Sequence, residues 1–179
     1  MSQSLVESIG PVPLLKMHPS AKTFLDLGCG PGSISRYAAS RGLSVLAIDR
    51  WRMVPERIRG MEGVRYLQKD LHHWSPEEET WDIIVLLNVI QFLDRGYVLE
   101  TLLPRLVKHL KPAGLIEIET FAPGSMESFN VPSRYVSDEI VRSLTGLAIL
   151  EQRMFEYDGP DMHGTKRHFH LTWVRAKRA

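Results

Sequence analysis

Three glycines follow an aspartate at alternate positions in the stretch LDLGCGPGS, near the start of the sequence. Asp26 precedes Gly28, Gly30 and Gly32. Glycines cost backbone entropy, so this cluster predicts a chain that bends sharply and approaches a ligand closely. The dinucleotide-binding pattern G-x-G-x-x-G is not met, because the third glycine comes one residue early and Ser33 takes its place. An acid directly before such a turn suits a cationic group better than a diphosphate.

Two further acids follow apolar segments later in the chain. Asp49 closes LSVLAID and Asp70 closes VRYLQKD, so each lies at the end of an expected strand, as Asp26 does. The carboxyl ends of parallel strands meet at one edge of an open α/β sheet, where ligands bind. We therefore expect the three carboxylates to line one site. S-adenosylmethionine carries a positively charged amine and a sulfonium beside adenosine, which makes it the ligand that these acids suggest.

The elements that must position these residues alternate between short apolar runs and amphipathic stretches, which predicts a sheet covered by helices. Runs that are apolar on both faces are typical of buried parallel strands. The expected strands span residues 22–27, 43–49, 64–70, 81–88 and 113–121, and two extended segments at 147–157 and 166–177 predict an antiparallel hairpin. The expected helices span residues 32–42, 97–114 and 137–144, with a short one within 50–60.

Particular residues mark the limits of these helices. Gly42 is expected to close the first, and Pro55 to occupy the first turn of the short helix. Pro104 predicts a kink or restart, because proline cannot donate the hydrogen bond of a helix interior. Ser137 is expected to cap the last helix. Together these elements predict an α/β fold with a mostly parallel, seven-stranded sheet and a C-terminal antiparallel hairpin.

On these residues the chain resembles the class I S-adenosylmethionine-dependent methyltransferases, from about residue 23 to 121. LDLGCGPG resembles the family's first motif, D/E-x-G-x-G-x-G, and WDIIVLLNVIQFL and LPRLVKHLKPAGLIEIETF resemble its fourth and fifth. The resemblance implies a three-layer Rossmann-like fold, with Asp49 on the ribose hydroxyls and Asp70, with Leu71 beside it, on the adenine amino group. The expected cofactor-binding residues are Asp26, Gly28, Cys29, Gly30, Gly32, Asp49, Arg50, Asp70, Leu71 and Asn88. Within the family, the C-terminal DMHG and basic last strand are loosely similar to the small tellurite-resistance-type enzymes.

Methyl transfer from a sulfonium is a direct displacement that depends mainly on alignment and exclusion of water. A general base is needed only when the acceptor is protonated at the working pH. The candidate catalytic residues are Asn88, after the fourth strand, and His163, in the hairpin loop. Cys29 is interpreted as a small residue in a tight turn rather than a nucleophile. The spacing of the seven histidines predicts no metal site.

Length and composition indicate one domain at residues 21–179, preceded by an extension at residues 1–20 that is a candidate lid. The single cysteine and the absence of a leader or a long apolar run indicate a cytoplasmic protein without a membrane segment. A net charge of +1 argues against bulk attraction to nucleic acid or lipid. A compact domain favours a small-molecule methyl acceptor, with no indication of the oligomeric state.

Three alternatives follow from the same sequence. A nicotinamide-dependent oxidoreductase would need a glycine in place of Ser33 and an acid–base set that the sequence does not offer. The sequence is also compatible with a non-catalytic module that binds the cofactor, because the residues of the acceptor site are the hardest to identify from the sequence. Methylation of RNA or of protein is a further alternative, and the basic residues after Asp161 are compatible with an RNA substrate.

Overall fold

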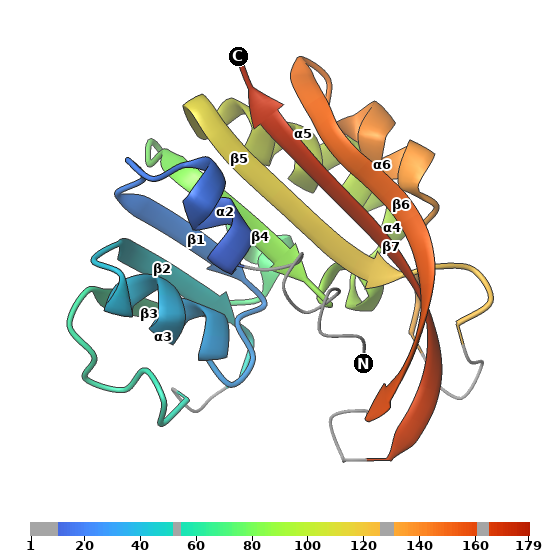
Figure 1. The fold of residues 1–179 in the computed structure, drawn as a ribbon, viewed down its shortest axis with the longest axis horizontal. Helices are drawn as coiled ribbons and strands as arrows, with labels where there is room; N and C mark the ends of the chain where they lie inside the picture. Colours follow the sequence, from blue (N-terminus) through green and yellow to red (C-terminus); the bar gives the residue numbers. More distant parts are fainter. Residues whose placement is uncertain (1–10, 52–54, 126–130, 161–164) are drawn as a thin grey trace.

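Seven strands form one sheet in the computed structural model, which describes residues 11–51, 55–125, 131–160 and 165–179. The strand order is β3-β2-β1-β4-β5-β7-β6, with β1 to β5 parallel and β7 antiparallel to both of its neighbours (Figure 1). The strands are β1 (Thr23–Leu27), β2 (Ser44–Asp49), β3 (Val64–Gln68), β4 (Trp81–Leu87), β5 (Leu110–Phe121), β6 (Leu147–Pro160) and β7 (Lys166–Arg178). The predicted mostly parallel sheet with a C-terminal hairpin is therefore confirmed.

Helices cover both faces of this sheet and make three layers (Figure 1). One core lies under α2 (Pro11–Met17) and α3 (Ser33–Ser40), where Leu14 and Ala38 pack on alternate residues of the central strands. The other core lies under the opposite helices, with Leu102 and Ile140 among its fully buried members. The helices on that side are α4 (Arg95–Tyr97), η3 (Val98–Leu102), α5 (Leu103–Lys108) and α6 (Ser137–Ser143). Two short 3-10 turns, η1 (Leu71–His73) and η2 (Ile90–Phe92), follow β3 and β4 respectively. Among the helices described, none has the length and apolar character that crossing a bilayer requires.

The predicted irregularity at Pro104 is present as a segment of π-helix. Proline cannot donate to the carbonyl four residues earlier, so the regular ladder is interrupted close to it. The π-helical segment η3 fills that interval and α5 carries Pro104 in its first turn. The predicted helix end at residues 111–114 is wrong, because α5 stops at Lys108 and β5 already begins at Leu110.

Two other helix limits also differ from the prediction. Ser137 is the first residue of α6 rather than its cap, and the N–H of Val136 is satisfied by the Glu139 carboxylate, 3.2 Å away. Residues 56–60 form turns and no helix. The N–H groups of Ile58 and Arg59 both donate to the Pro55 carbonyl, which gives one turn that does not propagate.

Candidate functional site

The glycine-rich turn after β1 lies at the carboxyl end of the parallel strands. The N–H groups of Gly28 and Cys29 both donate to the Ile48 carbonyl, at 2.8 and 3.1 Å, which ties the turn to the end of β2. Gly28, Gly30 and Gly32 all have positive φ angles, of 72°, 48° and 78°. Side chains other than glycine rarely adopt this left-handed region, so the alternate glycines allow the turn its shape.

The three glycines meet different surroundings. A Cβ at Gly28 would lie 2.3 Å from Val89, and one at Gly32 would lie 2.9 Å from Ile58. A Cβ at Gly30 would have no atom within 4 Å. The glycine cluster predicts close approach of a ligand at Gly28 as well, but the Val89 side chain occupies the space where a Cβ of residue 28 would lie. Only Gly30 both bends the chain and faces open space, so it is the point of the turn where a ligand can approach the backbone.

Asp49 holds the turn from the end of β2. Its Oδ2 accepts the N–H of Gly30 at 2.8 Å, and its Oδ1 accepts the N–H of Trp51 at 3.2 Å. An ionised carboxylate offers about four acceptor positions, so these two bonds leave capacity on both oxygens. Asp49 therefore combines a fixed orientation with unused acceptor positions beside the open side of Gly30.

Asp26 lies deeper, at the base of the turn. Its side chain is 2% exposed, and its Oδ2 accepts the Ser35 hydroxyl of α3 at 2.5 Å. Burial raises the pKa of Asp26 to about 6, against the effect of the Ser35 hydrogen bonds and with a smaller contribution from the Asp49 charge. The sequence correctly places Asp26 beside the turn, and its contact with a cationic group stays a prediction.

Asp70 follows β3 and caps η1. Its Oδ1 accepts the backbone N–H of His72 at 2.9 Å and lies 3.0 Å from the Nδ1 of the same residue. These contacts, led by the backbone hydrogen bond, hold the pKa of Asp70 below its usual value. The next residue, Leu71, turns its side chain into the core, and its carbonyl accepts the Tyr97 hydroxyl at 2.6 Å. Asp70 thus presents an ionised group at the surface, whereas Leu71 can reach a ligand only through its backbone.

Asn88 comes directly after β4 and pairs with a residue that the sequence analysis missed. Its φ of 56° is left-handed, its N–H donates to the Glu119 carbonyl at 2.8 Å, and its Nδ2 donates to the Glu119 Oε1 at 2.6 Å. Burial raises the pKa of Glu119, although this hydrogen bond and the charge of Arg153 act in the opposite direction. A glutamate next to the end of an apolar strand was the signal that could have revealed the pair.

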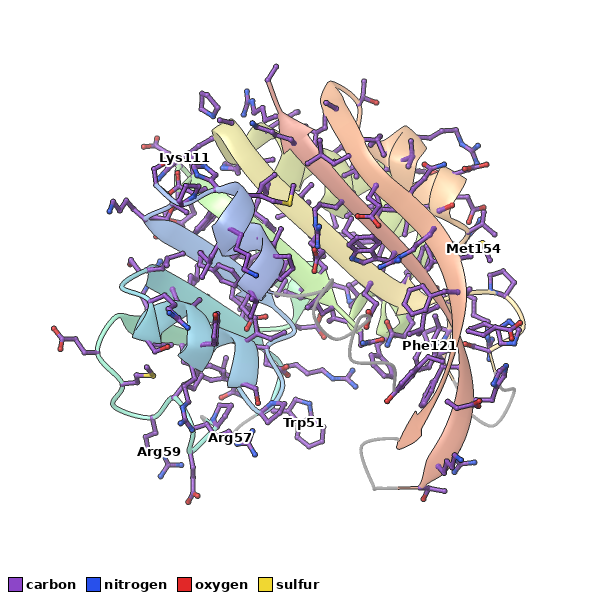
Figure 2. The ribbon with its side chains drawn as sticks, in the orientation of Figure 1. Trp51, Arg57, Arg59, Lys111, Phe121 and Met154 are labelled. Carbon is purple, nitrogen blue, oxygen red and sulfur yellow. The ribbon has the colours of Figure 1, made fainter. Side chains whose placement is uncertain are left out.

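Cys29, Arg50 and Trp51 complete the turn and its surroundings. The Cys29 thiol is buried, and burial, with the charges of Asp26 and Asp49, raises its pKa, which supports the interpretation of Cys29 as structural. Arg50 is exposed beside Asp49. Trp51 is 63% exposed and projects from the lower edge of the molecule in Figure 2. Trp51 is not among the predicted site residues, although a large aromatic side chain two residues after the strand-ending acid is a signal that could have revealed it.

His163, the second candidate catalytic residue, lies outside the residues that the structure describes. A surface groove of about 470 Å³ runs between η3, α5 and α6, and none of the predicted site residues lines it. The site at the carboxyl ends of the strands is therefore formed by the glycine turn, the acids around it and the Asn88–Glu119 pair.

Known proteins with similar sequences are methyltransferases. The trans-aconitate 2-methyltransferase of Azoarcus sp. (strain BH72) is 33% identical over 105 residues, covering 55% of this chain and 39% of that protein. The malonyl-[acyl-carrier protein] O-methyltransferase of Enterobacter lignolyticus (strain SCF1) is 28% identical over 116 residues, covering 64% and 45%. The chain thus spans less than half the length of these relatives.

The fold is also shared with solved structures. TehB from Haemophilus influenzae superposes with a TM-score of 0.75 at 20% identity, covering 94% of this chain and 61% of that one. At this identity the likeness concerns the fold. A family model described as a methyltransferase domain matches residues 8–170, which include the whole of the site described above. The chain therefore belongs to the methyltransferase domain family.

Proposed function

We propose that this chain transfers a methyl group from S-adenosylmethionine to a small-molecule acceptor. The observation that carries the proposal is the arrangement at Gly30, whose N–H fixes the Asp49 carboxylate while its own surface faces open space. A ribose needs two hydroxyl acceptors close together, and Asp49 has acceptor positions left on both oxygens. The residues present therefore fit the cofactor that the family implies.

Three other side chains would hold the rest of the cofactor. Asp70 is exposed and ionised, which suits the adenine amino group, and Trp51 offers an aromatic face for the adenine ring. Asp26 is buried with a raised pKa, so a cationic group nearby would favour its ionised form. In this assignment Gly28, Cys29 and Gly32 serve by shaping the turn, and the role of Arg50 is electrostatic.

When bound, the cofactor would supply a methyl group on a sulfonium, whose sulfur leaves readily as a neutral thioether. The protein then has to align the acceptor and exclude water. The Asn88–Glu119 pair lies at the ends of β4 and β5, where a hydrogen-bonding acceptor can be oriented. A carboxylate with a raised pKa is also suited to take a proton from the acceptor, so Glu119 joins Asn88 and His163 as a candidate catalytic residue.

A small acceptor is supported by the names of the relatives, which act on trans-aconitate and on a malonyl group carried by acyl-carrier protein. Two of the five basic residues after Asp161 give little support to RNA. Arg175 pairs with buried Glu117, and Arg178 donates to the carbonyls of Val107, Lys108 and Leu110. Both guanidinium groups are thus engaged within the fold.

We retain two further proposals about organisation. The catalytic unit is residues 21–179 acting in the cytoplasm, with residues 1–20 as an extension. Part of that extension is built into the fold, because Leu14 of α2 is fully buried in the core. A lid function therefore concerns only residues 1–10, which lie outside the described residues.

Titration calorimetry with S-adenosylhomocysteine tests the cofactor assignment. The unmodified chain should bind with micromolar affinity, and Asp49→Ala should bind at least tenfold more weakly. Glu100→Ala, which removes an exposed acid beside the distant groove, should bind as the unmodified chain does. Equal binding by Asp49→Ala would remove the ribose assignment. Transfer of labelled methyl from the cofactor to a panel of small carboxylic acids, phenols and amines then tests the activity, and failure with every acceptor would favour a non-catalytic module.

A further inference from the structure

Two histidines of β7, His168 and His170, lie on one face of the C-terminal hairpin. β5 ends at Phe121, and β6 and β7 continue beyond it as a two-stranded pair (Figure 1). In this pair Glu156 is opposite His170. Asp158 is opposite His168 in the same register. Side chains two residues apart on a strand share a face, so these four polar groups lie together. The other face carries an aromatic cluster that includes Phe155, Tyr157 and Phe169.

The Glu156 carboxylate approaches both imidazole rings, whose centroids are 5.0 Å apart. Its Oε2 is 3.6 Å from the Nε2 of His168, and its Oε1 is 3.9 Å from the Nε2 of His170. Both distances exceed those of good hydrogen bonds. Two ligands of one tetrahedral zinc ion, at bond lengths of about 2.1 Å, stand roughly 3.4 Å apart. One potential ligand atom from each of the three residues lies within 4.8 Å of the others, so a small movement would place all three on one ion.

Neighbouring groups hold the two imidazoles in place. The Nδ1 of His168 lies 2.8 Å from the Asp158 Oδ1, an arrangement that directs the Nε2 toward Glu156. Such a carboxylate–histidine pair is the usual support of a metal-binding imidazole. The His170 ring lies against Gly124, where a Cβ would come within 3.1 Å of its Nδ1. The backbone of His170 is fixed by the Ser125 hydroxyl, which accepts its N–H at 2.9 Å.

We propose that Glu156, His168 and His170 bind a divalent transition-metal ion, for which zinc is the natural candidate. Two imidazoles and one carboxylate are a common zinc ligand set that leaves a coordination position open. The side chains are 65%, 46% and 32% exposed, so an ion can enter from solvent and an external ligand can complete its coordination. The sequence predicted no metal site because the spacing of the histidines alone is uninformative. Pairing of β6 with β7 supplies the missing carboxylate, and the inference is independent of the proposed activity.

Calorimetric titration of the full, chelator-treated chain with zinc chloride tests this site. We expect one zinc ion per chain, and cobalt in its place should give the visible absorption of a tetrahedral complex. His168→Ala and His170→Ala should each weaken zinc binding at least tenfold. Asp158→Ala, which removes only the support of His168, should weaken it about tenfold. His73→Ala, the removal of an exposed histidine elsewhere, should leave zinc binding unchanged.

Two results would overturn the proposal. One is the absence of stoichiometric zinc binding by the unmodified chain, which would identify the cluster as ion pairs between histidines and acids. The other is zinc binding by the double variant His168→Ala/His170→Ala that equals that of the unmodified chain. Circular dichroism of each variant without metal shows whether the hairpin is still folded. Titration with S-adenosylhomocysteine, measured separately, keeps failure of the metal site distinct from failure of the cofactor assignment.

Discussion

Replacing Asp26 by asparagine should stabilise the cofactor-free protein at neutral pH. Burial raises the pKa of this 2% exposed side chain from 3.8 to about 6. A carboxyl group with a higher pKa in the folded state favours folding at low pH, and that contribution is lost as the pH rises through about 6. The difference is about two pKa units, and at about 1.4 kcal/mol for each ionised Asp26 costs about 3 kcal/mol at pH 7. Asparagine avoids this cost and can still accept the Ser35 hydroxyl.

Urea denaturation without cofactor measures the effect. At about pH 7.5 the free energy of unfolding of Asp26→Asn should exceed that of the unmodified chain by about 2 to 3 kcal/mol. The difference should shrink as the pH falls from 6 toward 4, because Asp26 then becomes protonated in the folded state. A variant that is less stable at pH 7.5, or a difference that stays constant with pH, would refute the reasoning.

Asp82 provides a matched control of opposite sign, at the end of the sheet where Figure 2 labels Lys111. Burial would raise its pKa, but the N–H groups of Lys22 and Thr23, the Thr23 hydroxyl and Lys111 all donate to its Oδ2 and hold the pKa at about 2. A lowered pKa stabilises the folded state above about pH 4, and this contribution is lost as the pH falls toward 2. Asp82→Asn should therefore lose at least about 1 kcal/mol at pH 7.5, where Asp26→Asn gains stability.

Three further predictions concern the turn, the core and the thiol. Gly28→Ala should lose about 2 to 4 kcal/mol of stability in urea denaturation. Gly30→Ala should lose only about 1 kcal/mol, yet it should bind S-adenosylhomocysteine at least tenfold more weakly. Equal losses of stability in the two variants would contradict the difference in free space around Gly28 and Gly30. Arg175→Ala should lose about 3 to 5 kcal/mol because it removes the guanidinium that pairs with the buried Glu117 carboxylate, and Arg175→Ala/Glu117→Leu should recover part of that loss. Cys29 should react with a thiol reagent at least a hundredfold faster in urea than in buffer, and rapid reaction in buffer would mean that the turn is open.

The mostly parallel sheet and the position of the acids at strand ends could be predicted because they depend on simple patterns. β1, β2 and β4 are apolar on both faces, and their burial specifies a covered parallel sheet without further information. Since parallel strands share one carboxyl edge, Asp49 and Asp70 are brought together by topology alone. The long antiparallel hairpin follows from two extended segments around a turn-rich loop.

The side chains that complete the site could not be predicted, because their partners come from distant segments. Glu119 reaches Asn88 only because β5 pairs with β4, and the two residues are far apart in sequence. The close contact of Gly28 with Val89 likewise depends on how the segment after β4 folds back. Ser137 is a favourable cap by type, yet Val136 takes that position since Glu139 reaches its N–H from within the helix. Local preference was overridden in each case by a tertiary contact.

The position of β7 between β5 and β6 has a consequence for biosynthesis. While the chain emerges from the ribosome, β6 has no neighbour and β5 keeps an unpaired edge until residues 166–178 have been made. An exposed strand edge is a template for association with other chains. Nascent molecules released before that point would therefore be more prone to aggregate, because β7 pairs with the edge of β5 and with one edge of β6 and leaves β3 and β6 as the edge strands of the described sheet.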